Sequence, residues 1–222
     1  MDTIEVLASE IEADLQSKYL AASIAGSGRR ADEVLTQAFD HQWTVNEIYL
    51  NIFQPTGYRI GTLWQTNQIS VAQEHLVTAV IERQMGELHA QFKPTTVKPR
   101  TLVIGSVDKE NHRVGARMVA DFFEQDGWTV HYLGAAVPTK SFLAMAREMQ
   151  ADLVGLSSEM IFHLPAIIEF VRQADSFGLS GIPIMVGGMP FIQQPELYSK
   201  LEVHFSGIDA HEAVDKANQL FG

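Results

Sequence analysis

Apolar side chains recur at three- and four-residue intervals through roughly the first ninety residues, which is the spacing of amphipathic helices. The pattern predicts four helices, over about residues 3–24, 30–42, 44–64 and 70–92. Thr44 is expected to cap the third helix, with Glu47 three residues on completing a capping box. Four helices joined by short loops predict a helical bundle spanning residues 1–92.

From Thr101 onward the pattern changes to short β-branched runs that alternate with amphipathic stretches. Strands are expected from Thr101 and at residues 128–133, 152–157, 182–186 and 203–206. Helices are expected from Val114 and over residues 139–150, 165–177 and 209–221. This alternation predicts a parallel, doubly wound sheet in residues 101–222. The proline-containing segment 93–100 is expected to link the two domains.

Composition narrows the class of protein. The chain has 222 residues, is 46% hydrophobic and carries a net charge of -11, so it is globular and acidic. Nucleic-acid binding through a basic surface is therefore not expected. The absence of cysteine excludes a disulfide framework and thiolate chemistry. No secretory signal and no membrane-spanning apolar run is recognised, so the expected location is cytoplasmic.

The loop after the first expected strand carries the candidate chemistry. Glu110, His112 and Gly115 follow one another there, at a strand-to-helix junction where open α/β sheets bind ligands. A neutral imidazole is a good ligand for a transition metal, and a carboxylate on its other nitrogen would fix its tautomer. One histidine is too few for a metal held by protein alone, but it suffices where a macrocycle fills the other positions. An inert surface histidine is the alternative at this point.

The run Glu110-Asn-His112-Arg-Val-Gly115 resembles the signature Asp-x-His-x-x-Gly of the cobalamin-binding domain, with Glu in place of Asp. That resemblance implies a flavodoxin-like (Rossmann-like) fold with five parallel strands. It also implies that His112 displaces the dimethylbenzimidazole tail of cobalamin and ligates cobalt from below, with Glu110 as its hydrogen-bond partner.

Two further strand ends extend the resemblance. The third strand ends at Ser157-Ser158-Glu159 and the fourth at Gly187-Gly188, which alone would be ordinary turn chemistry. In this order and spacing they are similar to the Ser-x-Leu and Gly-Gly elements that line the tunnel for the nucleotide tail in that family. Ser157, Gly187 and Gly188 are therefore expected around the tail. Glu159 stands where the family usually has Leu, so the rim of the tail pocket is expected to differ.

The fourth helix presents a polar face. Val71, Glu74 and His75 share one side at helical spacing, whereas Leu76 and Val80 mark the side expected to face the bundle core. A polar patch close to a tryptophan at a helix end suits an adenosyl group, which has a stacking base and ribose hydroxyls. The alternative is a tryptophan in the core beside a solvated Glu-His pair.

The spacing of Trp64 from Glu74-His75 resembles that of adenosylcobalamin-dependent light sensors related to the carotenoid-gene repressors. In those sensors the tryptophan covers the upper face of the corrin. The residue after it is a histidine that takes the upper cobalt position after photolysis, whereas here it is Gln65. With helical periodicity from the first few residues, the chain is more similar to the stand-alone relatives, some of which also bind a bilin.

The resemblance implies a cobalamin-binding light sensor, not itself an enzyme, that holds adenosylcobalamin and signals by conformational or oligomeric change. Its expected partners are further copies of itself or a downstream signalling protein, and a bilin is a possible second chromophore. Two alternatives stay open. Corrinoid methyl carriers for methyltransferases also pair a bundle with this domain, and a plain cobalamin-binding or storage module would carry no signal.

Overall fold

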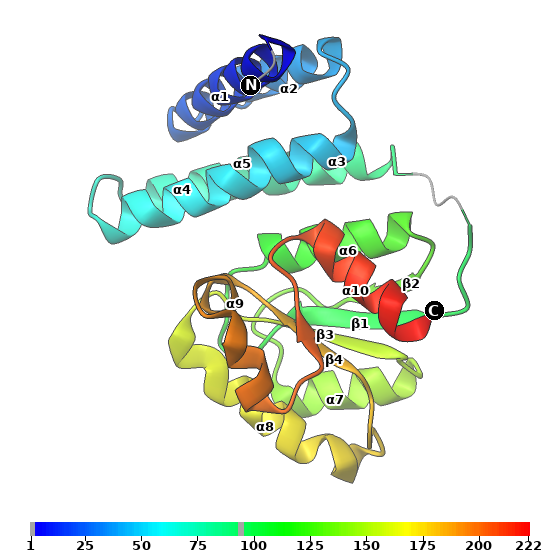
Figure 1. The fold of residues 1–222 in the computed structure, drawn as a ribbon. Helices are drawn as coiled ribbons and strands as arrows, with labels where there is room; N and C mark the ends of the chain where they lie inside the picture. Colours follow the sequence, from blue (N-terminus) through cyan, green and yellow to red (C-terminus); the bar gives the residue numbers. More distant parts are fainter. Residues whose placement is uncertain (1–2, 93–95) are drawn as a thin grey trace. The chain divides into compact units, whose positions relative to one another are not determined.

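The computed structural model describes residues 3–92 and 96–222, with side chains from residue 8 onward. The chain divides into two compact units, Met1–Phe92 and Lys93–Gly222, called here the helical unit and the sheet unit. Both are drawn in Figure 1, the first in blue and cyan and the second from green to red. Each unit has its own set of buried apolar side chains.

The helical unit contains four helical rods within its described residues. They are α1 (Thr3–Ile24), α2 (Gly28–Asp40), the consecutive segments α3 (Val45–Ile48), η1 (Tyr49–Phe53) and α4 (Gln54–Gln65), and α5 (Val71–His89). The four predicted helices are confirmed, although the last ends three residues early. The π-helical segment η1 lies just before Pro55, whose missing N–H interrupts the regular backbone pattern at that point.

Two capping boxes fix where helices begin in this unit. The Thr44 hydroxyl accepts from the Glu47 N–H at 3.2 Å, and the Glu47 carboxylate accepts from the Thr44 N–H at 2.6 Å. Ser70 and Gln73 make the same reciprocal pair at the start of α5, at 3.2 and 2.9 Å. Each pair satisfies two backbone donors that the first turn leaves without a helical partner. The cap predicted at Thr44 is confirmed.

The buried side of α5 differs in part from the prediction. Its buried residues are Val77, Val80, Ile81, Gln84, Met85 and Leu88. Val80 is in the core as expected, but Leu76 is 41% exposed, so its assignment to the core was wrong. The buried side of α5 follows positions 77, 81, 84 and 88. Leu76 precedes Val77 by one residue, so its side chain is rotated by about 100° around the helix axis, away from the buried side.

The sheet unit holds five parallel strands in the order β2-β1-β3-β4-β5. The strands are β1 (Thr101–Ser106), β2 (Thr129–Tyr132), β3 (Leu153–Ser157), β4 (Ile184–Gly187) and β5 (Phe205–Ser206). This is the flavodoxin-like order, so the predicted fold class is confirmed. The order reverses between β1 and β3, which pair from Leu102–Leu153 to Ser106–Ser157.

Helices cover both faces of this sheet, as Figure 1 shows. On one face lie α6 (Val114–Gln125) and α10 (Ala210–Phe221), and on the other lie α7 (Thr139–Glu148) and α8 (Leu164–Ala174). The second face carries a core of β-branched strand residues and aromatic helix residues, among them Val103, Val154, Phe142 and Phe170. Burial on both faces explains why the central strands read as nearly continuous apolar runs.

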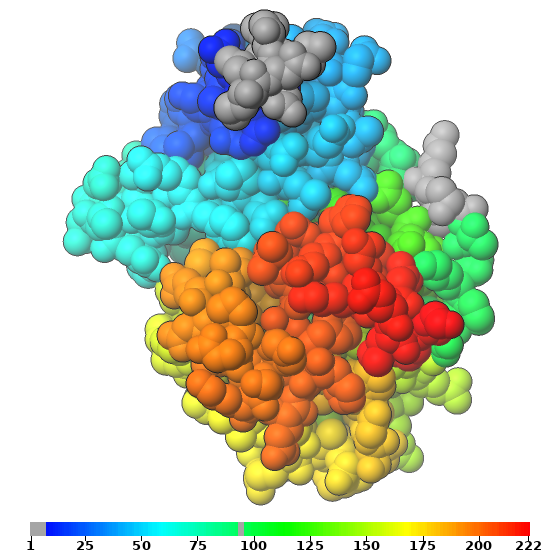
Figure 2. Space-filling model, viewed as in Figure 1, coloured from blue at the N-terminus to red at the C-terminus, as the bar shows by residue number. Residues whose placement is uncertain are grey.

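Short segments that periodicity did not predict complete the unit. They are the 3₁₀ turns η2 (Ile161–His163) and η4 (Pro195–Leu201), and the five-residue helix α9 (Met189–Gln193). The 3₁₀ turn η3 (Asp175–Phe177) lies within the predicted helix 165–177 and forms its last turn. In Figure 2 the orange surface of α9 and η4 and the red surface of α10 lie on the same side of the sheet unit. Segments this short contain too few residues for a helical repeat to be recognised.

The predicted linker 93–100 begins with three residues that lie outside the described part of the chain. Its later part is attached to the sheet unit. The Lys98 N–H donates to the Gly127 carbonyl at 2.8 Å, and Lys98 Nζ lies 2.6 Å from Asp126 Oδ2 and 2.9 Å from Asn218 Oδ1. Gly127 has φ +94, and a Cβ there would overlap the Thr96 carbonyl, so glycine is required where the segment crosses.

Candidate functional site

The loops after β1 and β3 leave the sheet at the point where the strand order reverses. Ser106 and Ser157 are the last residues of these strands and are paired in register. The Val107 N–H donates to the Ser157 carbonyl at 3.0 Å, and Ser106 Oγ donates to the His112 carbonyl at 2.6 Å. The first loop is therefore folded back over the strand ends, where a parallel sheet of this order binds its ligands.

Glu110 is the centre of this arrangement. Its side chain is fully buried, yet its carboxylate accepts five hydrogen bonds. Oε1 accepts from the His112 N–H at 3.0 Å and from His112 Nδ1 at 2.6 Å. Oε2 accepts from the N–H groups of Glu159 and Met160 at 2.9 and 3.1 Å, and from His163 Nδ1 at 2.9 Å. Each carboxylate oxygen therefore binds one imidazole.

The charge on Glu110 is stabilised by these donors. Burial alone would raise the pKa of the carboxyl group, but the hydrogen bonds from His112 and His163 lower it to about 2. The group is therefore ionised at neutral pH. A buried carboxylate with this many donors is a fixed anchor for the loops after β1 and β3.

His112 takes the orientation that a metal ligand requires. Because Nδ1 is the ring nitrogen bound to Glu110, Nε2 is the nitrogen that could ligate a metal. The side chain is 44% exposed, so a bulky ligand can reach it. A carboxylate on the distal nitrogen fixes the tautomer and raises the basicity of the imidazole. This donor set fits a macrocyclic cofactor that needs one axial nitrogen from the protein.

His163 was missed by the sequence reasoning. It ends η2 in the loop after β3, and its side chain is largely buried against Glu110. The signal available in the sequence was weak, namely a single polar residue between Phe162 and Leu164. Only the fold brings it, over a separation of 53 residues, to the carboxylate that also holds His112.

The residues expected around a nucleotide tail lie together at the ends of β3 and β4. Ser157 pairs with Gly187, and the Ser158 N–H donates to the Gly187 carbonyl at 3.0 Å. Gly188 has φ +114, and a Cβ there would come within 2.0 Å of the Ser158 carbonyl oxygen. A Cβ at Gly187 would meet nothing within 4 Å, so space is open beside that strand end.

Gly115 lies in the first turn of α6, where an added Cβ would also meet nothing within 4 Å. Crowding within the described residues therefore does not explain glycine at this position. The structure places it next to the His112 loop, and its expected role in cofactor binding stays a prediction.

The residues expected above the corrin belong to the helical unit. Trp64, 36% exposed, and Val71 lie on either side of the turn that joins α4 to α5. His75 is 74% exposed, and its Nδ1 lies 2.6 Å from Glu74 Oε2. The other Glu74 oxygen accepts from Thr78 Oγ1 at 3.0 Å. The Trp64 end of the bundle thus exposes an aromatic and an apolar side chain, with a hydrogen-bonded polar group on the next turn.

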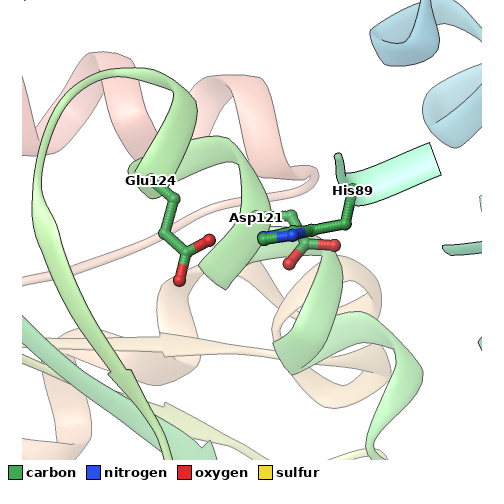
Figure 3. A group of neighbouring side chains, drawn as sticks. All are labelled: His89, Asp121 and Glu124. Atoms are coloured by element: carbon green, nitrogen blue, oxygen red, sulfur yellow. The ribbon is translucent and has the colours of Figure 1, made fainter. Parts of the chain in front are cut away.

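Two carboxylates also stand out on α6, Asp121 and Glu124, which Figure 3 draws. Asp121 is buried, and its Oδ1 accepts from Arg117 Nε at 2.6 Å on the same helix. The third side chain in that view, His89, comes from α5 of the helical unit. Within the sheet unit, Asp121 is therefore engaged in an intrahelical ion pair.

Comparison with known proteins identifies the family. A model described as a B12 binding domain matches residues 100–217, which is more than half of the 222-residue chain. The chain belongs to the B12 binding domain family. A second model with the same description matches residues 15–89 of the helical unit. The prediction of a cobalamin-binding protein is therefore confirmed, and cobalamin or a related corrinoid is its cofactor.

The relatives in this family carry corrinoid names. Over 124 residues the chain is 32% identical to dimethylamine corrinoid protein 1 of Methanosarcina acetivorans, covering 55% of this chain and 57% of that one. It is 32% identical to dimethylamine corrinoid protein 2 of Methanosarcina mazei, covering 73% and 76%. Trimethylamine corrinoid protein 2 of Methanosarcina acetivorans is 28% identical, with 84% and 85% covered. The chain thus spans a little over half of the first of these relatives.

Solved structures agree on the fold. The monomethylamine corrinoid protein of Methanosarcina barkeri is similar with a TM-score of 0.82 and 14% identity, covering 94% of this chain and 99% of that one. A methanol:cobalamin methyltransferase complex from the same organism is similar with a TM-score of 0.52 and 17% identity, covering 93% and 79%.

The names of these relatives bear on the three functional hypotheses. They favour the methyl-carrier alternative over the light sensor that the spacing of Trp64 suggested. The three sequence relatives are named as corrinoid proteins rather than as methyltransferases, which agrees with the prediction that the chain is not itself an enzyme. Among the described residues, no helix combines the length and the apolar character needed to cross a membrane.

Proposed function

We propose that the protein is a corrinoid methyl carrier that serves a methyltransferase. The observation that carries the proposal is the 2.6 Å hydrogen bond between the buried Glu110 carboxylate and His112 Nδ1, in a chain whose relatives are named for methylamines. When bound, cobalamin would supply the chemistry of taking up a methyl group and releasing it to an acceptor. The task of this chain is then to hold the cofactor and present it to partner enzymes.

His112 is proposed as the residue that would hold the cobalt through Nε2, with Glu110 as the partner that orients the imidazole. The ionised carboxylate makes the imidazole a stronger donor. His163 and the N–H groups of Glu159 and Met160 hold the carboxylate from the other side. The lower ligand is therefore positioned by the folded chain before the cofactor arrives, which reduces the cost of ordering it on binding.

Ser157, Gly187 and Gly188 are proposed to surround the nucleotide tail, with Gly115 in the neighbouring helix turn. The open space over Gly187 supports this assignment. On the helical unit, Trp64, Val71, Glu74 and His75 are proposed to bound the space above the corrin. Trp64 and Val71 expose apolar surface on the helical unit, and apolar surface suits a small methyl group better than water.

The direct test uses the full-length protein loaded with cobalamin and reduced, mixed with a purified methylamine methyltransferase. Dimethylamine and trimethylamine are the first donors to try, because the relatives are named for them. We expect methylation of the cobalt, seen in the visible spectrum, with release of an equal amount of demethylated amine. Tight cobalamin binding without methylation by either amine would count against the carrier.

Ligand preference separates the carrier from the light sensor without a partner enzyme. A methyl carrier needs no adenosyl group, so we expect methylcobalamin to bind at least as tightly as adenosylcobalamin. A strong preference for adenosylcobalamin, together with a change in size-exclusion profile after green light, would instead support the light sensor. Equal affinity for methylcobalamin and adenosylcobalamin, without methyl transfer, would instead support a cobalamin-storage module.

A further inference from the structure

Glu159 has a carboxyl group that takes no part in the five hydrogen bonds around the Glu110 carboxylate. Its backbone N–H donates to Glu110 Oε2 at 2.9 Å, so its position is fixed by the same carboxylate that orients His112. Its side chain turns toward the first turn of α9, where Oε2 lies 3.4 Å from the Met189 N–H. Among the described residues this is the one hydrogen bond its carboxyl group accepts, and its length makes it weak.

The surroundings of this carboxyl group are unfavourable for a charge. Burial, and to a smaller extent the charge of Glu110, raises the pKa of Glu159, against the opposing effects of the Met189 N–H and of His112. A partly buried polar group with one weak partner costs free energy that a further donor would recover. The family motif has Leu at this position, and that side chain needs no partner.

The end of β4 that faces the Glu159 loop has open space at Gly187. The preceding residue, Ser158, is hydrogen-bonded to the Gly187 carbonyl, and an added Cβ at Gly187 would meet nothing within 4 Å. A Cβ at Gly188 would lie 3.3 Å from the Glu159 backbone nitrogen, so the two strand ends approach closely there. At this position Glu159 has a carboxyl oxygen, whereas the family's Leu has only methyl groups to offer a ligand.

We propose that Glu159 selects the lower base of the corrinoid, in favour of bases that carry an exocyclic hydrogen-bond donor. This inference rests on the proposed function, because a base displaced by His112 must be accommodated below the corrin ring. Adenine offers an amino group and 5-hydroxybenzimidazole offers a hydroxyl group, and a carboxyl oxygen can accept from either. The edge of 5,6-dimethylbenzimidazole carries two methyl groups and offers no such donor.

The test measures dissociation constants of the full-length protein, free of cofactor, for three corrinoids that differ only in that base. We expect the adenine and hydroxybenzimidazole forms to bind about tenfold more tightly than the dimethylbenzimidazole form, the order expected for one added hydrogen bond. In Glu159→Leu the preference should vanish or reverse. In Glu159→Gln, which keeps the shape and one acceptor oxygen, it should be intermediate.

Two controls make the result specific. Cobinamide, which lacks the base, should bind equally to the wild-type protein and to Glu159→Leu. Glu196→Leu removes an exposed carboxylate from η4 and should keep the full preference. Equal affinity of the wild-type protein for all three corrinoids would overturn the proposal, even if Glu159→Leu failed to fold. The proposal would also be overturned if Glu159→Leu changed the affinity for cobinamide as much as it changed the affinity for the base-containing corrinoids. Failure of methyl transfer with the base preference intact would refute the carrier and leave this proposal standing.

Discussion

Replacing Glu110 by glutamine tests the centre of the site, because the change removes the charge while nearly keeping the shape of the side chain. The carboxylate is fully buried, and its pKa is lowered by folding from 4.5 to about 2. That difference corresponds to about 3 kcal/mol of stability at neutral pH. The glutamine amide would also place an NH₂ group against the donors that now bind one of the two carboxylate oxygens. Glu110→Gln should therefore lower the free energy of unfolding by about 3 kcal/mol.

The pH dependence has a definite sign. Because folding lowers the pKa of Glu110, its contribution is complete above the ordinary value of 4.5 and is lost as the pH falls through about 2. The difference in unfolding free energy between the wild-type protein and Glu110→Gln should therefore be largest near neutral pH. It should shrink progressively below pH 4.5.

Urea unfolding of the sheet unit provides the measurement. The chain has three tryptophans, and a Trp43→Phe, Trp64→Phe background leaves Trp128 as the reporter. Trp128 packs within the sheet unit against Phe123 and Phe221, with ring centroids 5.1 and 5.4 Å away. Unfolding of this unit should therefore change its fluorescence.

The matched control is Asp108→Asn, which removes a carboxylate from the same loop but outside the set of groups joined by Glu110. We expect this substitution to cost less than about 1 kcal/mol. If Glu110→Gln cost no more than the control, or if its effect were independent of pH, the assignment of Glu110 as the anchor of the two loops would be refuted.

Three further predictions concern the neighbouring residues. Gly188→Ala should destabilise the sheet unit by several kcal/mol in thermal or urea unfolding, since its Cβ would lie 2.0 Å from the Ser158 carbonyl, whereas Gly187→Ala should fold normally and weaken only corrinoid binding. His163→Ala removes one donor to Glu110 and should cost about 1–2 kcal/mol of stability; unchanged stability and an unchanged holoprotein spectrum would show that it is dispensable. Trp64→Ala should weaken methylcobalamin binding but leave the unfolding of the sheet unit unchanged, and equal affinity before and after the substitution would remove Trp64 from the site.

Much of the fold was predictable because local signals and the tertiary structure agree. The capping box at Thr44 and Glu47 marked a helix start that the structure has. The alternation of strand and helix patterns predicted the parallel sheet, and the order of the motifs implied its flavodoxin-like topology. Leu76 was assigned wrongly because its neighbour Val77 lies on the true buried line, and periodicity alone does not separate adjacent positions on a helix.

Part of the candidate site could also be predicted from the sequence, and part could not. Glu110 and His112 are two residues apart, so their pairing was accessible from the sequence, and the structure gives it at 2.6 Å. The contribution of His163 was not accessible, because it depends on two loops meeting at the strand-order reversal. The Glu110-His112 motif does not distinguish a light sensor from a methyl carrier. The Trp64 spacing suggested a light sensor, whereas the named relatives favour a methyl carrier.

The most direct test of the account is the identity of the nitrogen that binds cobalt. Paramagnetic resonance of the complex with cobalt(II) cobalamin, prepared with ¹⁵N-histidine protein and unlabelled cofactor, reports that nitrogen through its hyperfine splitting. We predict the ¹⁵N pattern in the labelled protein, and its loss in His112→Ala. An unchanged ¹⁴N pattern in the labelled protein would show that the cofactor's own base remains on the metal, and would contradict the role given to His112.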